Sequence, residues 1–152
     1  MSLEILIQIA TLISVMVGVV ALYFAIRGYR RQMNSQVFIE YTGRFEQIMQ
    51  SFPRGAWNAR LNLNAEPPEC SDELSLCALK YLNLCAEEYY LYKRGYLAKD
   101  VWKIWECELN RTLQSPLFKR EWRVLIGEFE SYPEFRDFVE KRQNQLSPRS
   151  DA

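Results

Sequence analysis

The stretch ILIQIATLISVMVGVVALYFAI, residues 5–26, contains no charged side chain, and its polar residues are Gln8, Thr11 and Ser14. As a helix rising about 1.5 Å per residue, it measures roughly 33 Å, close to the thickness of the hydrocarbon core of a bilayer. A signal peptide has a basic start and a shorter apolar core, whereas residues 1–4 include no Lys or Arg. We therefore predict one transmembrane helix over residues 5–26, preceded by a short extracytoplasmic N-terminus of residues 1–4.

Basic residues directly after this stretch predict its orientation. Arg27, Arg30 and Arg31 follow it, and Lys and Arg beside a span are retained on the cytoplasmic side. We expect a single-pass protein of the inner (cell) membrane, with its N-terminus outside and its C-terminal domain in the cytoplasm. The chain has 19 basic and 19 acidic residues, so nucleic-acid binding through bulk positive charge is not expected.

Small residues lie on one side of the predicted span. At 100° per residue they share an arc of about 80°, and Gly28 continues the line beyond the span. Such a face lets two helices approach closely in lipid. The sequence does not distinguish a homo-oligomer from a complex with a different membrane protein. We predict a homo-oligomer. The small-residue face consists of Ala10, Ser14, Gly18, Ala21, Ala25 and Gly28.

The rest of the chain has helical periodicity and no strand-like alternation. Residues 27–52 carry apolar side chains at three- and four-residue steps, which predicts an amphipathic juxtamembrane helix that continues the span or restarts after Asn34-Ser35. Residues 53–143 are expected to form a cytosolic bundle of four or five helices, and residues 144–152 a disordered tail. The predicted fold class is all-α.

Caps and breaks place the helices of this bundle. Ser71 is a good N-cap for a central helix that ends near Arg94, where Gly95 fits a left-handed position. Ser115 followed by proline starts another helix. Residues 131–134, Ser-Tyr-Pro-Glu, fit a capping box for the last one. The helices between are expected over residues 100–114 and 117–130.

The sequence contains none of the common catalytic motifs. It has no histidine, no Gly-rich phosphate loop and no pair of cysteines at metal-binding spacing. The usual base for a Ser or Cys nucleophile and the commonest metal ligand are therefore missing. We predict no enzyme activity, no cofactor and no metal site, and we expect the cysteines to be reduced thiols in the cytoplasm. They are Cys70, Cys77, Cys85 and Cys107.

One carboxylate lies within the apolar surface of the central helix. Glu88 falls on the helical wheel among apolar residues, so it needs a partner if it is buried. Arg94, Arg111 and Arg123 are the candidate partners in an ion pair that fixes helix packing. The alternative is that Glu88 contacts a ligand or acts as an ionisable switch. The Trp and Tyr residues of the domain pack in the core or, alternatively, line a groove for a planar ligand.

Two segments resemble a known family. They read RRQMNSQVFIEYTGRFEQI and LKYLNLCAEEYYLYKRGYLAKDVWKIW, and the second contains an Arg-Gly-hydrophobic turn at residues 94–97 before a Trp-bearing helix. This arrangement resembles an uncharacterised bacterial and phage family of short, single-span membrane proteins with an all-helical cytosolic domain. The resemblance covers about residues 27–130. It implies the architecture and no activity.

Three functions are compatible with these features. The first is a membrane-anchored, oligomeric interaction or sensor module whose cytosolic domain binds a protein or a small ligand, such as a nucleotide. Defence-type membrane effectors share this layout, which is an analogy of layout alone. The second is a structural tether of an inner-membrane assembly. The third, which we consider weakest, is an enzyme acting at the membrane surface.

Overall fold

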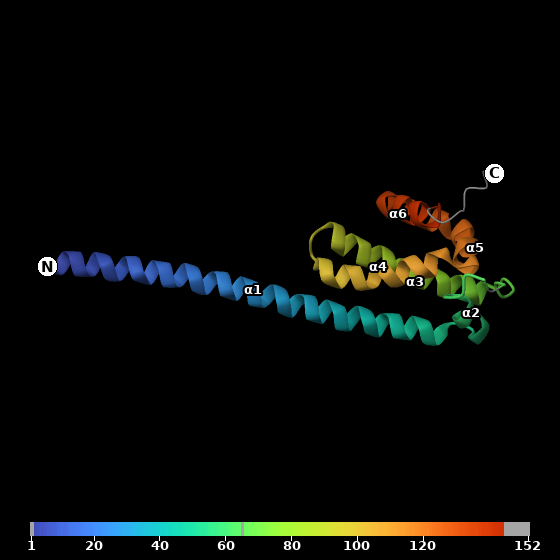
Figure 1. Ribbon diagram of the computed structural model, residues 1–152, viewed down its shortest axis with the longest axis horizontal. Helices are drawn as coiled ribbons and strands as arrows, with labels where there is room; N and C mark the ends of the chain where they lie inside the picture. The colour runs from blue at the N-terminus through green and yellow to red at the C-terminus, as the bar shows by residue number, and fades with distance from the viewer. Residues whose placement is uncertain (1, 65, 145–152) are drawn as a thin grey trace. The chain divides into compact units, whose positions relative to one another are not determined.

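The computed structural model describes residues 2–64 and 66–144, and helices are the only regular structure within them (Figure 1). This confirms the all-α fold class. By its internal contacts the chain divides into two compact units, which we call the apolar unit, Met1–Val37, and the helical domain, Phe38–Ala152. The helices are α1 (Leu3–Ser51), α2 (Arg54–Ala59), α3 (Asp72–Lys93), α4 (Lys99–Gln114), α5 (Pro116–Leu125), the 3-10 helix η1 (Ile126–Phe129) and α6 (Pro133–Asn144).

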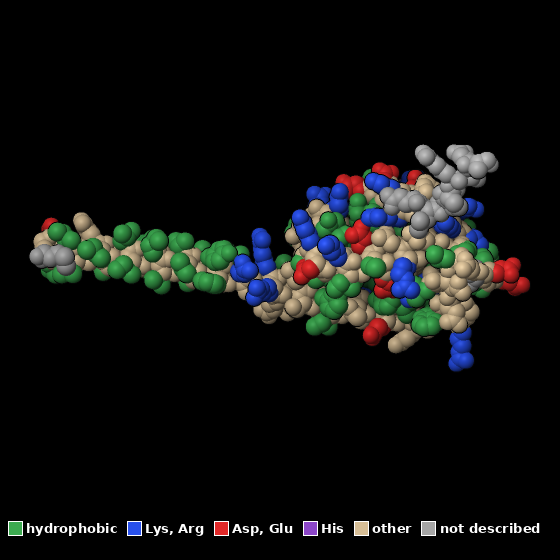
Figure 2. Space-filling view, viewed as in Figure 1, with side chains coloured by type: hydrophobic (Ala, Val, Ile, Leu, Met, Phe, Trp, Pro, Cys, Tyr) green, Lys and Arg blue, Asp and Glu red, His purple; other side chains and the backbone are tan. Residues whose placement is uncertain are grey.

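The apolar unit contains the first part of α1. This helix is long and apolar enough to cross a membrane, and none of its most apolar window is buried inside the structure. Figure 2 shows hydrophobic side chains along this segment and basic side chains where it ends. The hydroxyls of Thr11 and Ser14 donate to the main-chain oxygens four residues earlier, both at 2.9 Å. The structure thus bears out the predicted apolar helix.

The helix does not restart after Asn34-Ser35. Asn34 Nδ2 donates to the Arg30 carbonyl at 2.9 Å, and Ser35 Oγ donates to the Arg31 carbonyl at 3.1 Å. In both bonds the side chain donates to a main-chain carbonyl, so the main-chain N–H groups remain available for the hydrogen bonds of the helix. The helix α1 accordingly runs from Leu3 to Ser51 as one element. Of the two alternatives, the continuous helix is correct.

The core of the helical domain surrounds α3. This helix contacts α4, α5 and α6, and most of its circumference is buried, as its nearly continuous apolar surface predicts. Tyr81 is central to the packing, since its ring lies 5.2 Å from that of Phe118 and 6.3 Å from that of Phe45 between centroids. The buried residues of α3 are Leu74, Cys77, Ala78, Tyr81, Leu82, Leu84, Cys85, Ala86 and Glu88.

The predicted caps of α3 and α5 are present. The Ser71 side chain accepts a hydrogen bond from Leu74 N at 3.2 Å. At the other end of α3, Gly95 has φ 74°, a conformation that glycine adopts without strain, and the chain turns there toward α4. Ser115 caps α5, with Phe118 N donating to its hydroxyl at 3.3 Å.

Two predicted boundaries differ from the structure. The helix expected over residues 117–130 ends as an α-helix at Leu125 and continues as η1. The last helix starts one residue later than the capping box at residues 131–134 predicts: α6 begins at Pro133, and the Tyr132 carbonyl accepts from Phe135 N and Arg136 N at 3.1 Å each. Proline is favoured at the first helical position, which explains the shift. Apart from Asn144 at the end of α6, the predicted tail lies outside the described residues.

Candidate ligand pocket

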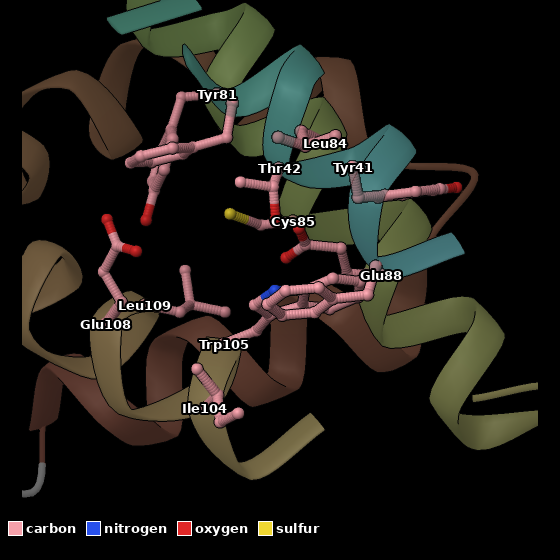
Figure 3. Close-up of a pocket in the computed structure, with 12 residues that line it drawn as sticks. Tyr41, Thr42, Tyr81, Leu84, Cys85, Glu88, Ile104, Trp105, Glu108 and Leu109 are labelled. Carbon is pink, nitrogen blue, oxygen red and sulfur yellow. The ribbon is translucent and has the colours of Figure 1, made fainter. Parts of the chain in front are cut away.

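A cavity of about 220 Å³ lies within the helical domain, between the C-terminal part of α1, α3 and α4 (Figure 3). Two of these helices contribute residues at the same spacing. On α1 and on α3 the four lining positions follow i, i+3, i+4 and i+7, which places each set on one helix face. The lining residues are Phe38, Tyr41, Thr42 and Phe45 on α1, Tyr81, Leu84, Cys85 and Glu88 on α3, and Ile104, Trp105, Glu108 and Leu109 on α4.

Glu88 is the buried acidic group of this cavity. Its residue is only 6 % exposed, and Figure 3 shows its carboxylate directed into the cavity. It forms no ion pair with any of the residues that the structure describes. Burial, together with the smaller effect of the charge of Glu108, raises the pKa of this carboxyl group to about 8. Glu88 therefore holds a proton at neutral pH, in a place where an ionised carboxylate lacks a partner.

The arginines expected to pair with Glu88 lie elsewhere. Arg94 is the C-cap residue of α3, with its guanidinium 5.3 Å from the centroid of the Tyr90 ring. Arg111 and Arg123 are exposed on α4 and α5. The structure thus confirms the burial of Glu88 but does not bring these three arginines to it. The ligand-contact interpretation of Glu88 stays a prediction.

One arginine beside the cavity, Arg44, is paired with the carboxylate that precedes Glu88 in the sequence. Arg44 donates two hydrogen bonds to Glu87, at 2.6 and 3.1 Å, and the Tyr41 hydroxyl donates to the same carboxylate at 3.3 Å. The contact with Arg44 lowers the pKa of Glu87. Glu87 and Glu88 are about 100° apart around α3, and the ion pair of Arg44 is with Glu87.

A second carboxylate lines the cavity, and this one is paired. Glu108 accepts a hydrogen bond from Arg60 at 2.6 Å, and Arg60 is only 5 % exposed. The Arg60 guanidinium also lies 5.4 Å from the centroid of the Phe45 ring. Glu108 is thus an acidic group of the cavity whose ion-pair partner is Arg60, in contrast to Glu88.

Two other polar groups of the cavity are weak acids that stay protonated. Burial raises the pKa of the Tyr81 hydroxyl and of the Cys85 thiol well above their usual values, and Glu88 raises that of Cys85 further. A thiol in this state is a poor nucleophile. Among residues 2–64 and 66–144, no three His, Cys, Asp or Glu side chains are grouped as metal ligands. The chemistry of the lining thus favours non-covalent binding.

Aromatic rings form much of the lining. The Trp105 ring stacks on Phe38 at 6.0 Å with an interplanar angle of 4°, and on Tyr41 at 5.6 Å and 26°. Phe38 and Trp105 are partly exposed, so this aromatic group reaches the surface of the domain. This arrangement is consistent with the alternative in which aromatic residues line a groove. Trp102 and Trp122, in contrast, are buried in the core.

Sequence reasoning did not connect Tyr41, Trp105 and Glu108 with Glu88. A signal existed in α4, because Glu108 follows Trp105 by three residues and therefore lies beside the apolar stripe of that helix.

The residues that set the predicted topology and the small-residue face are in the apolar unit. The described part of that unit places all of them on an exposed helix surface, with Arg27 donating to the Tyr23 hydroxyl at 3.3 Å. The helix–helix interface stays a prediction.

Comparison of the chain with protein-family models, with curated proteins and with solved structures gives no match. The family resemblance of residues 27–130 therefore stays a prediction, and the functional argument rests on the cavity and on the residues that line it.

Proposed function

We propose that this protein is a membrane-anchored sensor module whose helical domain binds a small ligand in the cavity at Glu88. The observation that carries the proposal is a buried carboxyl group, directed into a cavity and without an ion-pair partner among the described residues. Burying such a group costs stability. Binding sites are places where folds retain groups of this kind.

The route from the cavity to the membrane is α1. This helix, Leu3–Ser51, includes the apolar segment and also four residues of the cavity lining. A ligand that contacts Phe38, Tyr41 or Phe45 therefore contacts the same helix that enters the bilayer in our proposal. Ligand binding favours the arrangement of α1 in which the cavity is complete, and so shifts the population of its conformations.

The membrane placement rests on the apolar segment and its flanking charges. One helix is long and apolar enough to span a bilayer, and Arg27, Arg30 and Arg31 follow its apolar residues. We infer a single pass through the inner membrane, with the N-terminus outside and the helical domain in the cytoplasm. The small-residue face of α1 is the proposed contact with a second copy of the chain.

A cavity with an acidic, aromatic lining favours a ligand-binding module over the two alternatives. A structural tether needs an exposed docking surface and has no use for an unpaired buried carboxyl group. An enzyme needs an activated nucleophile or metal, and the Cys85 thiol is held protonated. We therefore place the tether second and the membrane-surface enzyme last.

The test is a ligand screen against a blocked cavity. Ile104 lines the cavity and is 60 % exposed, so Ile104→Trp closes the opening without disturbing the core. Val124 on α5 lies outside the cavity and is 70 % exposed, which makes Val124→Trp the matched control. A library of small molecules is added to the full chain in an uncharged detergent, and thermal unfolding is followed by tryptophan fluorescence.

We expect some compounds to raise the unfolding temperature of the wild type and of Val124→Trp but not of Ile104→Trp, because ligand binding to the folded state stabilises it. If no compound stabilises the wild type, or if the stabilisation persists in Ile104→Trp, ligand binding in this cavity is wrong.

A further inference from the structure

When Glu88 is ionised, the charges that the described residues place around the cavity lack one cation. Arg44 is paired with Glu87 and Arg60 with Glu108, so each of these pairs is close to neutral. Glu88 is the remaining acidic group, and it faces the cavity without an ion pair among the described residues. An anionic ligand would find no unmatched positive charge at Arg44 or Arg60, because both guanidinium groups are already paired with carboxylates. A ligand that carries one positive charge completes the balance.

The lining already attracts cations to its rings. The Arg44 guanidinium lies 5.0 Å from the centroid of Tyr41, and the Arg60 guanidinium lies 5.4 Å from that of Phe45. Both rings line the cavity. An aromatic face is electron-rich and attracts a cation within about 6 Å of its centroid, most strongly when the face belongs to Trp. Trp105 supplies such a ring at the edge of the cavity.

The cavity volume limits the size of the ligand. At about 220 Å³, it is smaller than the clefts of about 300–1,000 Å³ that hold drug-sized ligands, so it favours a compact molecule. A neutral apolar molecule would fill the space but would leave the buried Glu88 without a partner, and so would use only part of the lining. A compact cation uses both the carboxyl group and the rings.

From these observations we propose that the cavity binds a small organic cation of the ammonium class, whose charge pairs with ionised Glu88 and whose carbon groups lie against Trp105 and the other rings. This inference rests on the proposed function and names its ligand class. Binding exchanges one positive charge for another, because the proton on the Glu88 carboxyl group leaves to the solvent as the cation enters.

The proton exchange depends on the groups that face Glu88. Tyr41 and Arg44 face it from α1, Cys85 and Glu87 lie on its own helix, and Glu108 faces it from α4. The pKa of Glu88, about 8, is above neutral pH, so the carboxyl group must lose its proton before it pairs with a cation. The affinity for a permanent cation therefore rises with pH, by up to about tenfold per pH unit below this pKa.

The experiment compares two molecules of the same shape and different charge. Choline carries a quaternary ammonium that does not titrate, and 3,3-dimethylbutan-1-ol is its neutral isostere. Binding of each to the full chain is measured by titration calorimetry in an uncharged detergent. The titrations run at pH 6.5 and 7.5, in two buffers of different ionisation enthalpy that report the number of protons released. A second pair, butylammonium and 1-butanol, tests a primary ammonium in the same way.

We expect at least one cation to bind at least tenfold more tightly than its neutral partner, with about one proton released and higher affinity at pH 7.5. Glu88→Gln keeps the shape of the side chain and is expected to abolish the proton release and the preference for the cation. Glu140→Gln, at an exposed position of α6, is expected to keep both.

The inference is overturned if neither cation binds more tightly than its isostere, or if the preference survives in Glu88→Gln. A neutral compound that binds the wild type and not Ile104→Trp in the ligand screen would preserve the proposed function while the cation inference fails. The two claims are thus distinguishable.

Discussion

The two parts of α1 satisfy their polar side chains in different ways. In the apolar unit, Thr11 and Ser14 bond to main-chain oxygens of their own helix. In the helical domain, Tyr41 and Arg44 bond instead to Glu87 on α3. The first arrangement needs nothing from its surroundings and suits a medium without hydrogen-bond partners. The second needs a neighbouring helix. One continuous helix thus combines a self-sufficient segment with a segment that depends on tertiary contacts.

Adding positive charge to the apolar unit or to the helical domain is expected to give the largest difference between them. Val17→Arg together with Val20→Arg places two cations in the apolar unit, where each is expected to cost about 2.5–3.5 kcal/mol of membrane insertion. Ile39→Arg together with Val124→Arg adds the same charge at positions that are 70 % exposed in the helical domain. We expect the first pair to move the protein out of the membrane fraction of cells, and the second pair to leave it there. Equal membrane fractions for the two variants would contradict the anchoring role of the apolar unit.

The pH dependence of stability tests the helical domain separately. An ordinary glutamate ionises near pH 4.5, whereas Glu88 in the folded domain keeps its proton up to a pKa of about 8. Between these values the folded state binds the extra proton. The contribution of protonated Glu88 to the stability of the folded state is therefore fully present below about pH 4.5. It is lost as the pH rises toward about 8, at roughly 1.4 kcal/mol per pH unit.

Glu88→Gln removes this dependence, so the stability difference between wild type and variant is expected to move in favour of the variant as the pH rises from 5.5 to 7.5. Urea unfolding followed by tryptophan fluorescence measures the difference at each pH, and Glu140→Gln serves as the exposed control. A difference that stays constant over this range would show that Glu88 titrates normally, and the proton exchange proposed for the cavity would then lose its basis.

The sequence was most informative where a local rule decides the structure. The absence of charge in residues 5–26 identified the apolar helix, and Ser71 and Gly95 marked the ends of α3 because capping depends on a few neighbouring residues. The burial of Glu88 was also predictable, because its place on the helical wheel depends only on α3.

The cavity could not be predicted because its residues come from three helices. The partner of a carboxylate depends on which helix faces it, and Arg44 is 43 positions from Glu87. A helical wheel shows that Glu88 is directed inward, but it does not show that Trp105 and Glu108 meet it there. The sequence therefore favours arginines closer to Glu88, such as Arg94, whose guanidinium lies against the Tyr90 ring in the structure.

The smallest expected effect concerns the small-residue face, where the two parts of α1 again provide the comparison. Neither Gly18 nor Gly43 has a neighbouring atom within 4 Å of the position that a Cβ would take, so isoleucine fits both in the isolated chain. In the proposed oligomer, however, Gly18→Ile separates two helices that approach through this face, and we expect association to weaken roughly tenfold. Gly43→Ile lies in the helical domain and is expected to leave association unchanged. Sedimentation equilibrium in a density-matched detergent measures both. If Gly18→Ile associates like the wild type, the small residues of the apolar unit do not form the contact between copies.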